Sequence, residues 1–400
     1  MYKFNISAPG TIVLHGDHML EQNRSCIAAA LDIRTKLQFS SLSPRTVPRE
    51  HIKIEFSNIN LYLCIPLDAF YEHFYDQNVI RLFKSEERLV AIKEFLDVSN
   101  NFTGIYNSID ERQTSSLQAF LYLLLFIAYE ENIQITATII VKLWSDLPIG
   151  KGLGSSASFA VCLAACFLRW SFLQKGIVHY EFKNEDYKKI EYYALNCEKT
   201  IYNSQTLINV FTSVYGAITT FDDEGTCETM EEMLPMKILI VDANINQKME
   251  STSFILAKNM EYVKPCVDFI MNSLEAVMTT SARAVDEIYF KSINIRKDDS
   301  NWPVLVPLDS YKRISTFINM NQGLLKAMGM SSPNIDFICA IARKYSLASK
   351  ITSDNRFAFI FLLPNTNHQL IVKLTNELIS YNFLVIETTM VCTGVRIEAR

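Results

Sequence analysis

One short stretch of the sequence combines residues that could bind a phosphate. It covers positions 148–158 and has the sequence Pro-Ile-Gly-Lys-Gly-Leu-Gly-Ser-Ser-Ala-Ser, with three glycines at alternate positions that free the backbone from the steric limits of a Cβ. An apolar run at 159–170 predicts a helix after it, and a β-branched run at 135–144 predicts a strand before it. The first N–H groups of a helix lack partners, and the helix dipole attracts anions. Strand, glycine loop and helix therefore predict an anion site; a tight turn between a strand and a packed helix is the alternative.

Length and composition limit the classes of protein to which this chain could belong. The 400 residues are 49% hydrophobic and 20% charged, which indicates a folded chain of two domains or one large one. A net charge of −5 gives no support to nucleic-acid binding. The nine cysteines include no Cys-x-x-Cys pair, which favours free thiols and argues against zinc. No signal peptide is apparent, and the most apolar window is too short to span a bilayer, so we expect a cytoplasmic protein without membrane or nucleic-acid partners.

Periodicity predicts a mixed α+β architecture. An acidic stretch at 222–225 is a plausible domain boundary, and strand–helix–strand order after it suggests a second α+β half. The expected helices lie at 84–96, 115–129, 184–201, 254–282, 311–328, 332–345 and 369–381, and the expected strands at 211–220, 237–241, 357–363 and 383–389.

Several motifs resemble those of mevalonate kinases, which are GHMP kinases. The segments 7–10 (Ser-Ala-Pro-Gly) and 14–18 (Leu-His-Gly-Asp-His) resemble the first motif of mevalonate kinases. The stretch 147–157 resembles the glycine-rich motif shared across GHMP kinases. Further matches fall in the expected order at 31–35, 198, 320–322, 349–352 and 387–388, so the resemblance extends over the whole chain.

This resemblance implies a fold and a ligand set. GHMP kinases pair an N-terminal domain similar to ribosomal protein S5 with a smaller ferredoxin-like domain, here expected at 1–222 and 223–400, with ATP between them. Mg²⁺ would be held by Ser156 and Glu198, where hydroxyl and carboxylate oxygens suit a hard cation. Asp17 and His18 would lie near the substrate, and a homodimer is expected from the family. The implied nucleotide-binding residues are Pro148, Gly150, Lys151, Gly152, Leu153, Gly154, Ser155 and Ser156.

The sequence also departs from the family pattern. The lysine expected after the glycine of the first motif is Thr11, and the catalytic aspartate, eleven residues after the magnesium glutamate, is Asn209. Neither replacement carries a charge or accepts a proton. The third, glycine-rich motif is replaced at 352–358 by Thr-Ser-Asp-Asn-Arg-Phe-Ala, in which Arg356 or Phe357 would fill space near the ligand. The residues expected near the substrate carboxylate correspond to Met249 and Glu250.

Three functional interpretations follow. The first is a mevalonate kinase that transfers the γ-phosphate of ATP to the C5 hydroxyl of mevalonate in isoprenoid biosynthesis. The second is a catalytically impaired pseudokinase that keeps the fold and nucleotide binding, as the changes at Thr11, Asn209 and 352–358 suggest. The third is a GHMP-type kinase with another substrate, which would explain the altered region 242–252.

Overall fold

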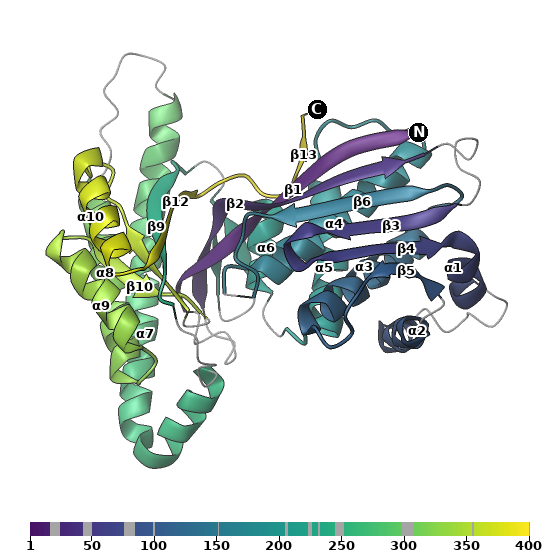
Figure 1. Ribbon diagram of the computed structural model, residues 1–400. Helices are drawn as coiled ribbons and strands as arrows, with labels where there is room; N and C mark the ends of the chain where they lie inside the picture. The colour runs from purple at the N-terminus through teal and green to yellow at the C-terminus, as the bar shows by residue number, and fades with distance from the viewer. Residues whose placement is uncertain are drawn as a thin grey trace.

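The computed structural model describes most of the chain as a mixed α+β fold. Within the described part, thirteen strands form one sheet, with helices packed against it. Figure 1 shows a larger lobe, which carries both ends of the chain, and a smaller lobe formed by the later helices. The α+β class predicted from periodicity is confirmed. The residues not described are 17–24, 43–49, 76–84, 99–100, 151, 205–206, 223–225, 231–232, 245–251, 298–307, 354–355 and 400, together with the side chains of 252–257, 260, 262 and 292–297.

Strand β2 connects the two parts of the sheet. Its first residues, 26–31, form a continuous apolar run and are buried on both faces, as a central strand requires. It pairs with β1 along most of its length and contacts strands of the second half through Leu31 and Met390. The strands of the larger lobe are β1 (Tyr2–His15), β2 (Cys26–Ser41), β3 (His51–Phe56), β4 (Leu61–Pro66), β5 (Thr103–Ile105), β6 (Ile139–Ser145), β7 (Ile218–Phe221), β8 (Cys227–Thr229) and β13 (Arg396–Glu398).

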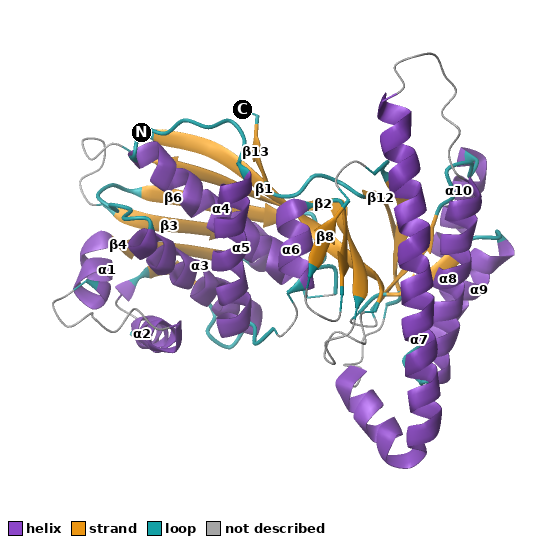
Figure 2. Cartoon of the chain, turned by 180° about the vertical axis from the view of Figure 1, so that it is seen from behind, coloured by secondary structure: helices purple, strands orange, loops and turns teal. Residues whose placement is uncertain are grey.

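Helices cover one face of this part of the sheet, as Figure 2 shows. Helix α4 is apolar all round, which is typical of a helix buried on every side. Among the described helices it is the one long and apolar enough to cross a membrane, but 89% of its apolar window is buried inside the protein. The helices of this lobe are α1 (Leu67–Phe74), α2 (Ser85–Asp97), α3 (Glu111–Glu130), α4 (Ser155–Gln174), α5 (Asn184–Ile201) and α6 (Ile208–Tyr215).

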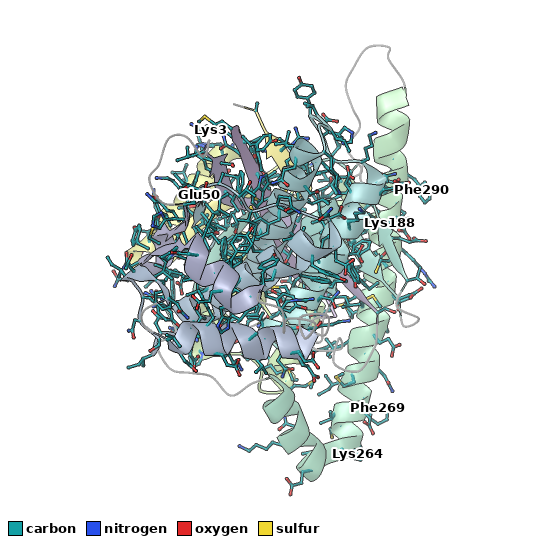
Figure 3. The ribbon with its side chains drawn as sticks, turned by 90° about the vertical axis from the view of Figure 1, so that its right-hand side faces the viewer. Lys3, Glu50, Lys188, Lys264, Phe269 and Phe290 are labelled. Carbon is teal, nitrogen blue, oxygen red and sulfur yellow. The ribbon has the colours of Figure 1, made fainter. Side chains whose placement is uncertain are left out.

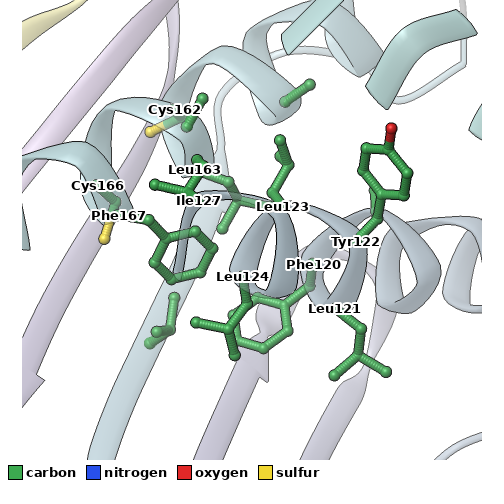
Figure 4. Packing of buried hydrophobic residues seen from close by; sticks show 14 of the residues in the cluster. Phe120, Leu121, Tyr122, Leu123, Leu124, Ile127, Cys162, Leu163, Cys166 and Phe167 are labelled. Carbon is green, nitrogen blue, oxygen red and sulfur yellow. The ribbon is translucent and has the colours of Figure 1, made fainter. Parts of the chain in front are cut away.

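The main core lies between α3, α4 and the sheet. Phe120 of α3 meets Phe167 of α4 edge to face, with ring centroids 5.6 Å apart (Figure 4). Cys162 and Cys166 lie in the same cluster, and burial raises the pKa of both thiols. All nine cysteines of the sequence are free, as their spacing predicts.

The smaller lobe packs four helices against four strands. Helix α7 contains Pro265 and a non-helical residue, Val263, which mark a kink. Phe269 and Phe290 of this helix are 75% and 63% exposed, and Figure 3 shows both pointing outward. The elements are β9 (Met236–Asp242), α7 (Thr252–Lys297), α8 (Leu308–Ala327), α9 (Pro333–Lys344), β10 (Ala348–Ile351), β11 (Phe357–Phe361), α10 (His368–Ser380) and β12 (Leu384–Met390).

The segment after β12 returns to the larger lobe and is held there by Arg34. This side chain is 4% exposed and donates to the carbonyl oxygens of Thr393 and Gly394 at 2.8 and 2.6 Å. Its Nε donates to the Ser7 hydroxyl at 2.8 Å. Burial lowers the pKa of Arg34, but the surrounding carbonyls and hydroxyl satisfy its planar fork. Arg34 therefore fastens the last strand, β13, to β1.

One predicted strand is wrong. The segment predicted as a strand at 211–220 begins instead as helix α6 and becomes strand β7 only at Ile218. Its β-branched residues favour a strand locally, but Val210 and Val214 are buried when the segment coils against β1 and α4. Tertiary packing overrides the local propensity here.

The predicted boundary between residues 222 and 223 falls between strands β7 and β8. Strands β7 and β8 pair across it, and β7 also pairs with β2. The division of the chain into domains at 1–222 and 223–400 stays a prediction.

Candidate active site

The glycine loop joins strand β6 to helix α4. Gly150, Gly152 and Gly154 all have positive φ angles, of 66°, 74° and 68°, which residues with a Cβ rarely adopt. The backbone N–H of Gly150 donates to the Ser155 hydroxyl at 3.0 Å, which folds the loop back on the start of α4. The loop thus presents the N-terminus of a 20-residue helix, where unpaired N–H groups and the helix dipole favour an anion.

Gly154 is required by a close approach to strand β1. A Cβ at this position would lie 2.1 Å from the Thr11 Oγ1 atom. The same strand residue donates its backbone N–H to the Leu153 carbonyl at 3.0 Å. The end of the glycine loop is therefore fixed against β1 by both a hydrogen bond and direct packing.

Ser156 and Glu198 are brought together from two helices. The Ser156 hydroxyl donates to Glu198 Oε2 at 3.4 Å. Glu198 is 5% exposed, and no described residue hydrogen-bonds its buried Oε1 atom. Burial raises the pKa of Glu198 to about 7, and the Ser156 hydrogen bond opposes that shift only in part. A buried carboxylate oxygen without a partner is a position where a cation would be strongly favoured.

These two residues fit Mg²⁺. A carboxylate and a hydroxyl are hard oxygen donors, and Mg²⁺ in nucleotide sites takes one or two protein ligands and completes its shell with water and phosphate oxygens. Within the described residues no group of three or more His, Cys, Asp or Glu side chains could hold a metal by itself. The donor set therefore suits a cation that arrives with a phosphate ligand.

Thr11 and Asn209, the two departures from the family pattern, contact each other. The Thr11 hydroxyl donates to Asn209 Oδ1 at 2.8 Å. Thr11 is 1% exposed, whereas Asn209 is half-buried at the start of α6. Two residues 198 positions apart thus form a neutral hydrogen-bonded pair beside the glycine loop.

A pocket of about 430 Å³ contains the glycine loop. One part has apolar walls, Phe56, Ile59, Leu143 and Phe159, and another presents the loop, Ser156 and Asn209. Ser353, two residues after the end of β10, brings the second half of the chain to the same pocket. The lining residues are Thr35, Phe56, Asn58, Ile59, Glu111, Arg112, Ser115, Ser116, Leu143, Ser145, Ile149, Gly150, Gly152, Gly154, Ser155, Ser156, Phe159, Tyr202, Asn209 and Ser353.

Most of the predicted nucleotide-binding residues line this pocket. Gly150, Gly152, Gly154, Ser155 and Ser156 are among the lining residues. Leu153 is instead buried in a hydrophobic cluster, and Pro148 does not line the pocket. Lys151 and the two predicted substrate residues, Asp17 and His18, lie outside the described residues, as do Met249 and Glu250.

The expectation for the third motif is wrong in one respect. Phe357 does not fill ligand space: it is 1% exposed, belongs to strand β11 and packs in the core of the sheet. The Arg356 carbonyl accepts from Ala243 N–H at 3.0 Å, so this residue continues the pairing of β11 with β9. The hairpin contributes Ser353, not an aromatic ring, to the pocket.

Sequence reasoning missed two polar groups of the pocket. Asn58 forms two hydrogen bonds of 2.8 Å with the backbone of Ser145, at the end of β6 where the loop begins. Ser116 hydrogen-bonds Tyr202, and burial raises the pKa of this tyrosine well above its usual range. Neither pair has a local sequence signal, because each joins segments more than 80 residues apart.

The chain is similar to GHMP kinases and, among curated proteins, to mevalonate kinases. The model of the GHMP kinase N-terminal domain matches residues 119–217, which include the glycine loop, Glu198 and Asn209. Mouse mevalonate kinase is 26% identical over 87% of this chain and 82% of its own length. Human mevalonate kinase is 23% identical over 98% of this chain and 94% of its own.

Solved structures share the fold. The mevalonate kinase of Methanococcus jannaschii superposes with a TM-score of 0.65 at 17% identity and covers all of this chain and 99% of its own. The L. major mevalonate kinase in complex with R-mevalonate gives a TM-score of 0.62 at 12% identity, over 98% and 97% of the two chains. The GHMP kinase fold implied by the motifs is confirmed.

Proposed function

The chain belongs to the GHMP kinase family as a divergent relative of mevalonate kinases, and from this premise we propose that it is a mevalonate kinase. It would transfer the γ-phosphate of ATP to the C5 hydroxyl of mevalonate. The observation that carries this proposal is that Ser156, which lines one pocket with the glycine loop, also hydrogen-bonds the buried Glu198 carboxylate. We further propose that it acts in the cytoplasm on this small molecule, with no nucleic-acid or membrane partner, and as a homodimer.

The glycine loop and the apolar side chains of the pocket would bind different parts of the nucleotide. The N–H groups at the start of α4 bind the phosphates, and the apolar side chains of the pocket receive the base. Ser156 and Glu198 would hold Mg²⁺, which would supply positive charge to the phosphate groups. In this arrangement catalysis depends on positioning and on neutralising charge.

The substrate proton has no acceptor at the Thr11–Asn209 pair. A hydroxyl and an amide do not take up a proton near neutral pH. As the alcohol oxygen bonds to the γ-phosphorus and the bridge to the leaving ADP breaks, the proton passes to a non-bridging oxygen of the transferred phosphoryl group. Replacing charged transition-state groups typically lowers rates by about a hundredfold or more, so we expect slow turnover.

A coupled assay for ADP release tests the proposal. Wild type is measured with MgATP in the presence and absence of mevalonate, beside Ser156→Ala and Glu198→Gln. We expect mevalonate-dependent release in wild type and its loss in both variants. No release, with MgATP still raising the melting temperature, would leave the pseudokinase interpretation. Release with another small alcohol and not with mevalonate would favour a changed substrate.

A further inference from the structure

The Asn209 amide turns its oxygen toward Thr11 and away from the rest of the pocket lining. Oδ1 is the atom that accepts from the Thr11 hydroxyl. Asn209 lines the pocket, whereas Thr11 lies behind it and is 1% exposed. An amide has its acceptor and its donor at opposite corners. With Oδ1 turned toward strand β1, the Nδ2 group is left on the pocket side.

No described residue uses that donor. The contact with Thr11 is the one hydrogen bond that the Asn209 side chain makes to the described part of the chain. The same threonine also touches Gly154 and bonds the Leu153 carbonyl, so the pair is anchored to the end of the glycine loop. Asn209 therefore lines the same pocket as the helix N-terminus expected to bind phosphate.

We propose that Asn209 donates a hydrogen bond to an oxygen of the transferred phosphoryl group and that Thr11 is a positioning residue that holds the amide in this orientation. This inference rests on the proposed phosphotransferase function and deepens it. Asn209 then works as an oxyanion donor and not as a weakened substitute for a base. An uncharged donor aimed at developing negative charge stabilises it without taking a proton.

Two substitutions at position 209 give opposite expectations for the two roles. Asn209→Leu removes the donor and keeps the approximate size, whereas Asn209→Asp replaces it with a carboxylate that repels phosphate. If Asn209 donates to the γ-phosphate, both variants weaken binding of the magnesium complex of a non-hydrolysable β,γ-imido ATP analogue, and the aspartate weakens it more. Loss of one hydrogen bond to a charged group corresponds to about ten- to a hundredfold in affinity.

Calorimetric titration with this analogue and with MgADP locates the contact. We expect the loss to be much smaller for MgADP, which lacks the γ-phosphate. Asn101→Asp is the matched control, because its amide also donates a hydrogen bond, to the Phe95 carbonyl at 2.8 Å, away from the pocket. Equal losses for both nucleotides, or no loss, overturn the inference. A higher turnover in Asn209→Asp also overturns it, because that result assigns the position to a base.

Thr11 is tested by rescue. Thr11→Val keeps the shape but removes the hydroxyl, so the amide loses its fixed orientation and kcat falls by about tenfold or more while the KM for mevalonate changes little. Thr11→Ser keeps the hydroxyl and retains turnover near wild type. Thr138→Val is the matched control: Thr138 is 2% exposed and accepts from His51 N–H at 3.1 Å outside the pocket. Equal kcat values for Thr11→Val and Thr11→Ser contradict the positioning role.

Failure of this inference is distinguishable from failure of the proposed function. Wild type that binds neither nucleotide sinks the phosphotransferase proposal itself. Wild type that binds the analogue, with Asn209 variants that bind it equally well, sinks only the role of the amide. Should Thr11→Val not fold, shown by the loss of a cooperative melting transition, the comparison of Asn209→Leu with Asn209→Asp still decides.

Discussion

The Ser156 hydroxyl reaches the Glu198 carboxylate at 3.4 Å, and this contact connects the first turn of α4 to the last turn of α5. The two residues belong to helices that pack side by side, so their spacing is set by the hydrophobic core and not by a flexible loop. A rigid support of this kind keeps a metal ligand in place before the metal arrives.

Burial of Glu198 predicts a pH-dependent cost in stability. Its pKa rises from an ordinary 4.5 to about 7 on folding, so the native state binds an extra proton between these values and stability falls as the pH rises through them. This difference corresponds to about 3 kcal/mol, fully present above pH 7 and absent below pH 4.5. Without Mg²⁺, Glu198→Gln should therefore raise the free energy of unfolding by up to about 3 kcal/mol at pH 8 and by little at pH 4.5.

Urea unfolding at the two pH values measures this effect. Glu387→Gln serves as the control, because Glu387 is an exposed partner of Lys237 and exposed pairs contribute about 0 to 1 kcal/mol. A Glu198→Gln variant that is less stable than wild type at pH 8 would falsify the desolvation cost.

Substitution of Ser156 should change the Mg²⁺ dependence of turnover, whereas substitution of the neighbouring Ser155 should change nucleotide binding. Ser156→Ala removes a metal-facing hydroxyl, so we expect the Mg²⁺ concentration for half-maximal turnover to rise by about tenfold. Ser155 accepts from the Gly150 N–H and supports the loop. Ser155→Ala should weaken nucleotide binding while leaving the Mg²⁺ dependence close to wild type. Identical Mg²⁺ curves for the two variants would contradict this separation.

Two glycines of the loop provide a matched steric test. Gly150 and Gly154 have nearly the same positive φ, so an alanine meets similar backbone strain at both. The space available for a Cβ differs between the two positions. At Gly150 a Cβ meets nothing within 4 Å, whereas at Gly154 it meets Thr11 Oγ1 at 2.1 Å. We expect Gly154→Ala to weaken ATP affinity by at least tenfold more than Gly150→Ala, measured by titration calorimetry. Equal losses would assign the effect to strain alone.

Removal of Arg34 should destabilise the whole chain. Arg34→Met leaves the carbonyls of Thr393 and Gly394 without their donor, at an expected cost of about 3 kcal/mol or more in the free energy of unfolding. Arg34→Lys should recover little, since one ammonium cannot reproduce the planar fork. Urea denaturation at pH 7 gives the comparison, with the half-exposed Arg396→Met as control. Full stability in Arg34→Lys would show that charge alone suffices.

The sequence predicts well those parts of the fold where local signals agree. The glycine loop follows a β-branched run and precedes an apolar one, so strand, turn and helix are each indicated by their own residues. Helix α6 was not predicted, because its Ile-Asn-Val-Phe-Thr-Ser-Val-Tyr sequence favours a strand until it is packed.

The candidate site likewise contains residues that the sequence predicts and a contact that it does not. Ser156 and Glu198 follow from motif positions, and the structure places them within hydrogen-bonding distance. The contact between Thr11 and Asn209 could not be derived from either residue alone, because strand pairing and helix packing bring it about across 198 positions. A comparison with the family pattern, made one position at a time, finds two separate replacements, Thr11 and Asn209. The structure shows that these two residues form one hydrogen-bonded pair.

The pairing of β1 with β13 also bears on how the chain folds. Ser7 and Glu398 hydrogen-bond although 391 residues separate them, so this strand pair is among the longest-range contacts the chain can form. The entropy of closing such a loop grows only with the logarithm of its length, so the separation slows folding more than it weakens the native state. In the folded chain, the segment beyond β12 leaves the smaller lobe and forms this strand pair in the larger one. Because the end of the chain that follows the smaller lobe is tied to the first strand of the larger lobe, the two lobes are expected to unfold in one cooperative transition.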